Sequence, residues 1–292
     1  MNRAQRRVRY GAPLSLEALI DAALAEDVGD GDRTTEWSVP EDLAGGARIV
    51  AKQAGIVCGL APAEAIFLRV DPELSVRGGV ADGARVAPGA EIMVVAGALR
   101  SILTAERTAL NFLGRLSGIA TLAADYCAAV EGTDCRILDT RKTTPGWRAL
   151  EKEATRCGGA VNHRRGLFDM VLVKENHIRA AGGLGAALQA VGERARREGI
   201  EVEVEACSLA ELREALAGGP DRILLDNMSI GELEEAVRLV RGHEGDVPLL
   251  EASGNVTLQT VGRIAATGVD FVSVGALTHS APVMDFSLQV IA

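Results

Sequence analysis

Cationic side chains are concentrated in one stretch of this sequence, residues 139–178. The stretch holds 8 Lys or Arg against 5 Asp or Glu, a net charge of +3 in a chain whose formal net charge is −9, so the remainder sums to −12. Arginine pairs with carboxylate or phosphate oxygens through a planar fork, and lysine supplies a compact point charge. A cationic stretch in an acidic protein therefore indicates a pocket for a small, multiply anionic ligand.

Within this stretch, the residues expected to contact the ligand lie next to strand-like apolar runs or next to another cation. They are Arg141, Lys142, His163, Arg164 and Lys174. Three further cations have helical spacing and lie beside acids, which predicts a solvated helix face instead; they are Arg148, Lys152 and Arg156.

Two carboxylates are candidates for a metal site. Glu205 closes the alternating run Glu201, Glu203, Glu205, and Asp226 ends the next apolar run. Two acids at neighbouring strand ends can hold a Mg²⁺ that keeps most of its waters and bridges substrate phosphates. Glu201 and Glu203 are expected to form salt bridges inside or beneath the sheet, because unpaired buried charges are costly. The spacing leaves Glu203 open as the alternative to Glu205.

Glycine-containing turns follow the last two strand-like runs. Backbone N–H groups at such turns bind phosphate without side-chain charge, and barrels often place a phosphate at their last two strand ends. The sequence therefore predicts phosphate binding at Ser253, Gly254, Asn255 and Gly275. The sequence contains no Ser/His/Asp or Cys/His set that would indicate a covalent nucleophile.

Strand–helix repeats are expected to position these side chains. The strand-like runs are residues 135–140, 170–174, 200–205, 222–227, 248–253 and 271–276, with amphipathic helices between them. This alternation predicts right-handed crossovers and a parallel sheet. Because the candidate residues end successive strands, we expect an α/β barrel rather than an open doubly wound sheet. With about six strands, this catalytic domain, residues 118–279, is an incomplete barrel.

The first part of the chain, residues 1–117, predicts an N-terminal α/β sandwich domain. Ser15 is the expected N-cap of a helix that Gly29 ends, and short β-like runs between 46 and 97 are separated by Gly, Pro and Asp. A helical stretch, residues 101–132, bridges the two domains, with a predicted break near Ser117–Gly118. Residues 280–292 are expected to pack back on the first domain.

Composition restricts the partners and the compartment. The chain is 48% apolar and 24% charged, which is ordinary for a globular protein, and its acidity argues against a nucleic-acid surface. The Arg-rich residues 1–12 suggest a loose basic arm without the apolar run of a signal peptide, and no membrane-spanning run occurs. Five scattered cysteines have neither CxxC nor zinc-ligand spacing. We therefore expect a cytoplasmic protein with no nucleic-acid and no membrane partner.

Eight motifs, in this order, resemble quinolinate phosphoribosyltransferase (nicotinate-nucleotide pyrophosphorylase, carboxylating). They are AEDVGDGDRTT, ERTALNFLGRLSGIAT, DTRKTTPGWRALEKEA, GGAVNHRRGLFDMVLVKENHI, EVEVE, LLDN, EASGN and VGALTHS, and the resemblance covers residues 14–285. It implies transfer of phosphoribose from phosphoribosyl pyrophosphate to quinolinate with decarboxylation. The products would be nicotinate mononucleotide, pyrophosphate and CO₂, with Mg²⁺ as the cofactor.

The resemblance also implies a division of roles. Quinolinate would be bound by Arg141, His163, Arg164 and Lys174, and Thr140 would also contact substrate. The phosphoribosyl pyrophosphate and metal side would be formed by Lys142, Glu205, Asp226, Ser253, Gly254, Asn255 and Gly275, with Lys142, Glu205 and Asp226 as the catalytic residues and the two acids as the metal ligands. The subunits would form a homodimer or a dimer-based hexamer, in which Arg107 reaches into the neighbouring active site.

Two alternatives stay open at this point. One is the molybdenum-transport-associated homologue of the same family, acting on another acceptor. The other is a non-catalytic module that binds phosphoribosyl pyrophosphate without turnover. The NHRRGLFDMVLVKENH wording, with Lys174, favours the quinolinate enzyme over the homologue, and the full set of cations together with both carboxylates argues against a module without turnover.

Overall fold

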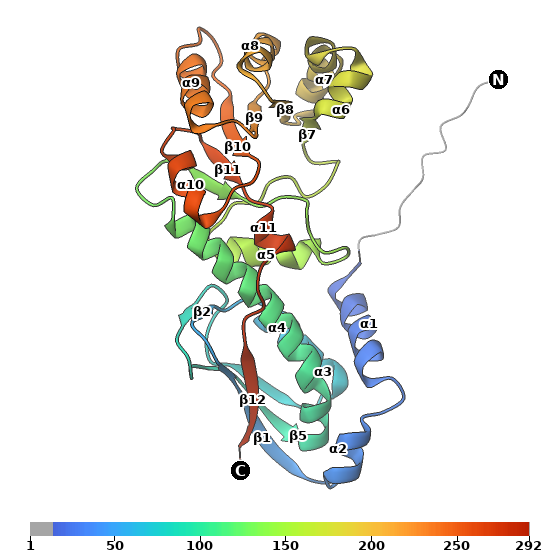
Figure 1. Ribbon diagram of the computed structural model, residues 1–292. Coiled ribbons are helices and arrows are strands. Elements are labelled where there is room, and N and C mark those ends of the chain that lie inside the picture. Colours follow the sequence, from blue (N-terminus) through green and yellow to red (C-terminus); the bar gives the residue numbers. More distant parts are fainter. Residues whose placement is uncertain (1–13, 292) are drawn as a thin grey trace, which may run out of the picture.

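The computed structural model describes residues 14–291, which form two regions joined by one long helix (Figure 1). The predicted basic arm at residues 1–12 lies outside the described residues. The division predicted between residues 117 and 118 falls within the long helix and stays a prediction.

The N-terminal region contains an antiparallel sheet in the order β12-β1-β5-β3, packed against α3 and α4. Its elements are α1 (Leu16–Val28), α2 (Arg33–Ser38), β1 (Ala44–Ala51), β2 (Gly55–Ile56), α3 (Leu60–Val70), β3 (Ser75–Gly78), β4 (Arg85–Val86) and β5 (Glu91–Ala98). The last strand of the chain, β12 (Phe286–Ile291), pairs with β1. The Ser15 side chain accepts a hydrogen bond from the Ala18 N–H, which confirms the predicted N-cap.

The second region contains a six-stranded sheet in the order β6-β11-β10-β9-β8-β7, with every pair parallel. Its elements are β6 (Arg136–Leu138), α5 (Arg148–Cys157), β7 (Val171–Val173), α6 (Glu175–Ala181), α7 (Leu184–Glu198), β8 (Val202–Ala206), α8 (Leu209–Gly218), β9 (Arg222–Asp226), α9 (Ile230–Arg241), β10 (Leu249–Ser253), α10 (Leu258–Ala265), β11 (Phe271–Ser273) and α11 (Ala276–His279). Among the described residues β6 and β7 are the two edges, so the barrel is open between them. The prediction of an incomplete six-stranded parallel barrel is confirmed.

The bridging helix α4 (Leu99–Ala128) runs for 30 residues without interruption (Figure 1), so the predicted break near Ser117–Gly118 is wrong. Gly118 lies against the Pro282 carbonyl, where a Cβ would collide with the backbone. The glycine therefore permits the C-terminal segment to cross α4 closely. Ser117 is fully buried and its hydroxyl binds both the N–H and the carbonyl of Cys58.

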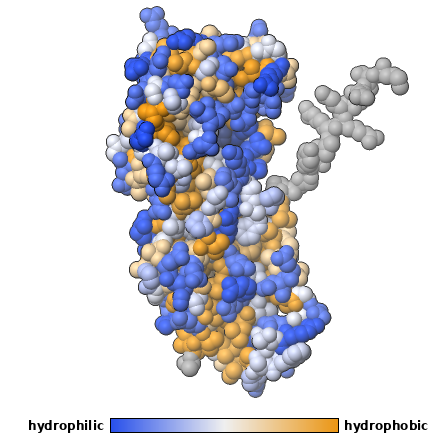
Figure 2. Space-filling view, in the orientation of Figure 1, coloured by the Kyte–Doolittle hydropathy of each residue, from blue (hydrophilic) through white to orange (hydrophobic). Residues whose placement is uncertain are grey.

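Apolar side chains form a separate core in each region, and α4 contributes to both. On the face shown in Figure 2, hydrophobic residues gather over the lower part of the molecule, whereas the upper part is mainly hydrophilic. Within residues 14–291, no helix combines the length and the apolar character needed to cross a membrane.

Candidate active site

The carboxyl ends of the parallel strands surround a pocket of about 400 Å³, which continues into a second pocket of about 430 Å³. The first is lined by these predicted residues: Thr140, Arg141, Lys142, His163, Arg164, Lys174, Glu205, Asp226 and Ser253. The second shares Thr140, Lys142, Asp226 and Ser253 and adds Gly254, Asn255 and Gly275. The structure thus brings every predicted site residue except Arg107 onto one continuous surface.

Arg107 lies elsewhere. It is exposed on α4 and lines a different pocket, beside Asp32 and Thr104 of the N-terminal region. This chain's own strand-end pocket is therefore formed without it.

Two arginines make the first pocket attractive to anions. Burial, and secondly the nearby Arg141 guanidinium, lower the pKa of Arg164. Among the described residues, the buried Nε of Arg141 has no hydrogen-bond partner, and Arg164 donates only to the Met170 carbonyl, at 3.3 Å. Two partly buried like charges with spare donors are stabilised by a ligand that carries carboxylates.

Lys174 and Glu205 occupy the rim of the same pocket and form an ion pair, with Nζ and Oε2 3.0 Å apart. Lys174 directly follows β7 and is the N-cap of α6, and the His177 ring accepts a hydrogen bond from its backbone N–H, which fixes the start of that helix. The sequence interpretation assigned Lys174 to a cationic half and Glu205 to an anionic half, but in the structure the two side chains are in contact. A bound substrate or metal ion must compete with this pair.

Asn227 links the ends of β9 and β10, and it was not predicted as a site residue. Its side chain donates to Asp226 Oδ2 at 2.7 Å and accepts from Asn255 Nδ2 at 3.2 Å. Gly254, at φ +103°, lies directly against this side chain, where no Cβ fits. Asn227 therefore orients both a predicted metal ligand and the predicted phosphate turn.

Gly275 has a helical φ, so its role is one of space rather than backbone strain. A Cβ there would meet the Lys142 side chain at 3.0 Å. Because β6 pairs with β11, the segment after β6 lies beside the segment after β11, and the Thr278 hydroxyl donates to the Lys142 carbonyl. Gly275 thus allows Lys142 to lie along the second pocket.

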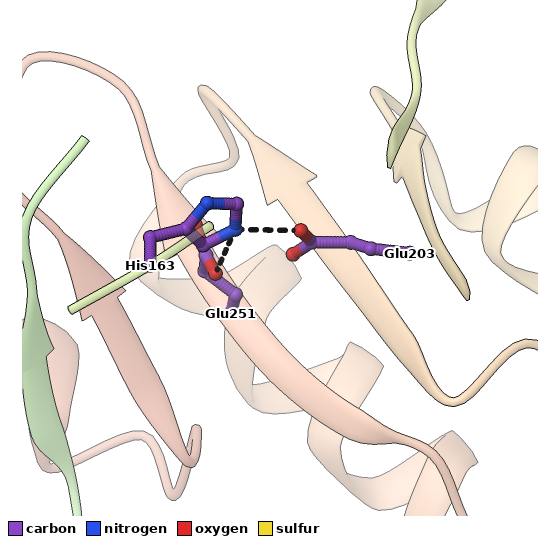
Figure 3. Close-up of side chains that lie close together, drawn as sticks. All are labelled: His163, Glu203 and Glu251. Carbon is purple, nitrogen blue, oxygen red and sulfur yellow. Dashed lines mark hydrogen bonds and ion pairs between the residues drawn. The ribbon is translucent and has the colours of Figure 1, made fainter. Parts of the chain in front are cut away.

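Below the rim, buried charged residues form a cluster that we call the floor: Asp139, Lys152, His163, Glu203, Arg222 and Glu251. Figure 3 shows three of them, His163, Glu203 and Glu251. His163 Nε2 is 2.7 Å from Glu203 Oε2 and 3.5 Å from Glu251 Oε2. Arg222 forms ion pairs with Glu251, at 3.3 Å, and with Glu201, at 3.1 Å. The pKa values of Glu203 and Glu251 are both raised to about 7, and burial is the largest cause for each.

The expected salt bridging of Glu201 and Glu203 matches these contacts. Glu203 is fully buried below the pocket, whereas Glu205 lies at its rim beside Asp226. The rim position and the Mg²⁺ preference for partly hydrated oxygens favour Glu205 over Glu203 as a metal ligand.

A second buried group supports His163 from its backbone. Asp139 accepts from the His163 N–H at 2.8 Å and from Lys152 Nζ at 2.5 Å, and Lys152 also donates to the His163 carbonyl. The prediction that Lys152 lies on a solvated helix face is therefore wrong, because its side chain is 2% exposed. Arg156, one turn further along α5, is exposed and pairs with Glu153 as predicted.

Several residues that line or support the pocket were not predicted from the sequence as part of the site: Asp139, Lys152, Asn227, Arg222 and Glu251. Three of them had a readable signal. Glu251 is an acid within the apolar run PLLEAS, and Arg222 begins the run RILLD, so both place a charge in a buried parallel strand. Asn227 directly follows a metal candidate.

The fold and the site together define a class of protein, an incomplete parallel α/β barrel that binds small polyanions at its carboxyl strand ends. The chain matches the family descriptions "Quinolinate phosphoribosyl transferase, N-terminal domain" over residues 32–117 and "C-terminal domain" over residues 119–289. It belongs to the quinolinate phosphoribosyl transferase family.

Similar proteins support this assignment. Quinolinate phosphoribosyltransferase [decarboxylating] 2a from Nicotiana tabacum is 44% identical, with 94% of this chain and 82% of that protein covered. The probable nicotinate-nucleotide pyrophosphorylase [carboxylating] of a Synechocystis strain is 43% identical, with coverages of 92% and 90%. The solved nicotinate-nucleotide pyrophosphorylase of Francisella tularensis has a TM-score of 0.89 at 38% identity, with coverages of 97% and 100%.

Proposed function

We propose that this protein transfers phosphoribose from phosphoribosyl pyrophosphate to quinolinate and decarboxylates the product to nicotinate mononucleotide, a step of NAD biosynthesis. The observation that carries the proposal is the joined pocket pair, with two arginines on one side and glycine turns on the other. Names of similar proteins point to the same reaction. The cation-lined pocket suits a pyridine dicarboxylate, and the glycine turns suit the sugar phosphates.

Mg²⁺ is the proposed cofactor, held by Glu205 and Asp226. Both carboxylates line the first pocket, and Asp226 also borders the second, where phosphates are expected. Hard oxygen ligands at a partly open rim fit an ion that keeps several waters. When bound, the ion would neutralise charge on the pyrophosphate leaving group.

In the proposed reaction, the chain's own residues mainly position and stabilise. Arg141 and Arg164 hold the two carboxylates, so that the ring nitrogen faces the sugar carbon. Lys142, which borders both pockets, stabilises charge that develops on the leaving pyrophosphate. The pyridinium formed by transfer withdraws electrons, which favours loss of the adjacent carboxylate.

We further propose a homodimer or a dimer-based hexamer in which Arg107 completes the neighbouring pocket. Its exposed position on α4, away from its own strand-end pocket, supports this role, as does the exposed Trp37 on the adjacent α2. Mixing Arg107→Ala with Lys142→Met subunits tests it. Regained activity in the mixture is expected, and a mixture as inactive as either variant alone argues against sharing.

Release of CO₂ from quinolinate tests the activity itself. With Mg²⁺ and phosphoribosyl pyrophosphate, the protein should release CO₂ and pyrophosphate in equal amounts and should neglect nicotinate as an acceptor. Turnover of nicotinate instead, or of neither acceptor, contradicts the proposal. A cytoplasmic location stays a prediction, since the plant relatives are named as mitochondrial or chloroplastic.

A further inference from the structure

Glu251 has no role in the reaction as described so far, yet its position is unusual. It lies in the middle of strand β10, only 1% exposed, and still lines the cationic pocket together with Arg141 and Arg164. Of the other buried floor acids, Asp139 also lines this pocket but is paired with Lys152, and Glu203 does not line it. A carboxyl group that is closed to bulk water but open to the substrate pocket can exchange a proton with a bound ligand.

Charged and polar groups face Glu251 from each neighbouring strand and from the loop before β7. Arg222 of β9 binds its Oε2 at 3.3 Å, and His163 Nε2 lies 3.5 Å from the same oxygen. Glu203 of β8 and the Ser273 hydroxyl of β11 also interact with it. Two buried carboxylates beside one guanidinium leave one negative charge in excess, and a bound proton neutralises it.

Burial first, and then the Glu203 charge, raise the pKa of Glu251 to about 7. A substantial fraction of molecules therefore carry a proton on this cluster near neutral pH. Arginine is not a proton donor, since its pKa lies above 12. Lys174 is paired with Glu205 at the solvent-exposed rim, and the Nε2 of His163 already faces Glu203. Lys142 also borders the second pocket and is assigned to the pyrophosphate side, and Asp139 is paired with Lys152, so Glu251 is the remaining acid of the cationic pocket.

The proposed reaction requires one proton at a defined carbon. When CO₂ leaves, the bond from the ring carbon to the carboxylate carbon breaks, and its electron pair stays on that ring carbon beside the positively charged nitrogen. Until this carbon is protonated, it can recapture CO₂ in the confined pocket. A positioned acid makes the step irreversible.

We propose, on the basis of the proposed function, that Glu251 is the general acid that protonates this ring carbon after CO₂ departs. The ring carbon gains the Glu251 proton and forms its new C–H bond, giving nicotinate mononucleotide. The Glu251 carboxylate left behind is stabilised by Arg222. A proton from solvent then restores the acid through the His163 imidazole, and no oxidant or further reactant is needed.

The test is Glu251→Gln in the full-length protein, which preserves the shape of the side chain and removes its acidic proton. With Mg²⁺, phosphoribosyl pyrophosphate and quinolinate, pyrophosphate and CO₂ release are measured in parallel in one turnover. We expect pyrophosphate release within about threefold of wild type and CO₂ release slower by roughly 10²-fold, the usual contribution of a general acid. Quenched samples should contain the carboxylated nucleotide.

Glu201→Gln is the matched control, because Glu201 also binds Arg222 but does not line the substrate pocket. It should release both products as wild type does. Equal slowing of both products in Glu251→Gln, or no slowing of either, would overturn the inference. If wild type releases neither product, the proposed function fails, which is a different outcome.

If Glu251→Gln does not fold, a measurement on the wild-type protein tests whether Glu251 is the proton donor. The rate of CO₂ release relative to pyrophosphate release should fall as pH rises through about 7, because the Glu251 cluster loses its proton there. A ratio that does not change with pH would count against Glu251 as the donor.

Discussion

The floor and the rim of the strand-end pocket use the same kinds of charged residue in different ways. On the floor, Lys152 and Asp139 are at most 2% exposed and are satisfied by protein partners. At the rim, Lys174 is 48% exposed, and its partner Glu205 is 12% exposed. Buried pairs are strongly coupled to folding, whereas exposed pairs contribute little and exchange partners easily.

Because of this difference, a stably folded barrel can present a binding surface whose ion pairs are exchangeable. The floor fixes His163 from both sides, through its ring by Glu203 and through its backbone by Asp139 and Lys152. The charged side chains at the rim, Lys174 and Glu205, can exchange each other for a substrate or a metal ion as binding partner. Mutations should therefore separate stability from substrate affinity according to depth.

The largest expected effect is on the floor. Lys152→Met should lower the free energy of unfolding by about 3–5 kcal/mol, because it leaves the Asp139 carboxylate buried without its cation. Urea unfolding measures this, with Arg156→Met on the exposed side of α5 as the control, expected within about 0.5 kcal/mol of wild type. Similar losses in the two variants would remove the distinction between floor and surface.

The floor should also make stability depend on pH. The pKa of Glu251 is raised by burial from 4.5 to about 7, so the folded protein binds this proton more tightly than the unfolded chain. Its contribution is complete below about pH 4.5 and is lost as pH rises through about 7. We expect the unfolding free energy to fall by roughly 2–3 kcal/mol more in wild type than in Glu251→Gln between pH 5 and pH 8. Equal pH slopes in the two proteins would contradict the assignment.

At the rim side of the pocket, Arg164→Ala should weaken quinolinate binding. Loss of a charged hydrogen bond costs about 2 kcal/mol, or roughly a 30-fold rise in the quinolinate KM, with the phosphoribosyl pyrophosphate KM nearly unchanged. Arg165→Ala removes the same charge from the adjacent exposed residue, which does not line the pocket, and should have little effect. If the KM values of both substrates rise together, the two pockets do not divide the substrates as proposed.

The sequence predicted the rim better than the floor. All six strands and the residues that end them follow from apolar runs and turn residues, which are local signals. The partners of buried charges depend on which strands become neighbours, as when β8, β9 and β10 bring Glu203, Arg222 and Glu251 together. Helical spacing predicted that Lys152 is solvated, because the spacing of charges along one helix does not reveal that the buried Asp139 packs against that face of the helix.

The glycines of α4 show a similar limit. A Ser–Gly pair within a helix predicts a break from propensity alone. Here the helix continues, because the missing side chain makes room for the Pro282 carbonyl of a segment more than 160 residues away in the sequence. The close approach of two backbone segments depends on the tertiary structure, so a local sequence pattern does not predict it.

A smaller effect is expected for the proposed metal site. Asp226→Asn keeps an acceptor for Asn227 but removes the negative charge. The Mg²⁺ concentration at half-maximal activity should rise about tenfold, equivalent to about 1.4 kcal/mol. Thermal stability without Mg²⁺ should be unchanged, since the side chain is only partly buried at a strand end. An unaltered Mg²⁺ titration would remove Asp226 from the metal site.

A small stability effect, to be compared directly with that of Lys152→Met, is expected for Lys174→Met. It breaks an ion pair between the same two kinds of group, with an N–O distance of 3.0 Å instead of 2.5 Å, but at the rim. The unfolding free energy should change by less than about 1 kcal/mol, because exposed pairs are screened and hydrated. The quinolinate KM should nevertheless rise, because the cation is lost from the pocket. Should Lys174→Met destabilise the protein as much as Lys152→Met does, depth in the barrel would not be what separates structural from substrate-binding charges.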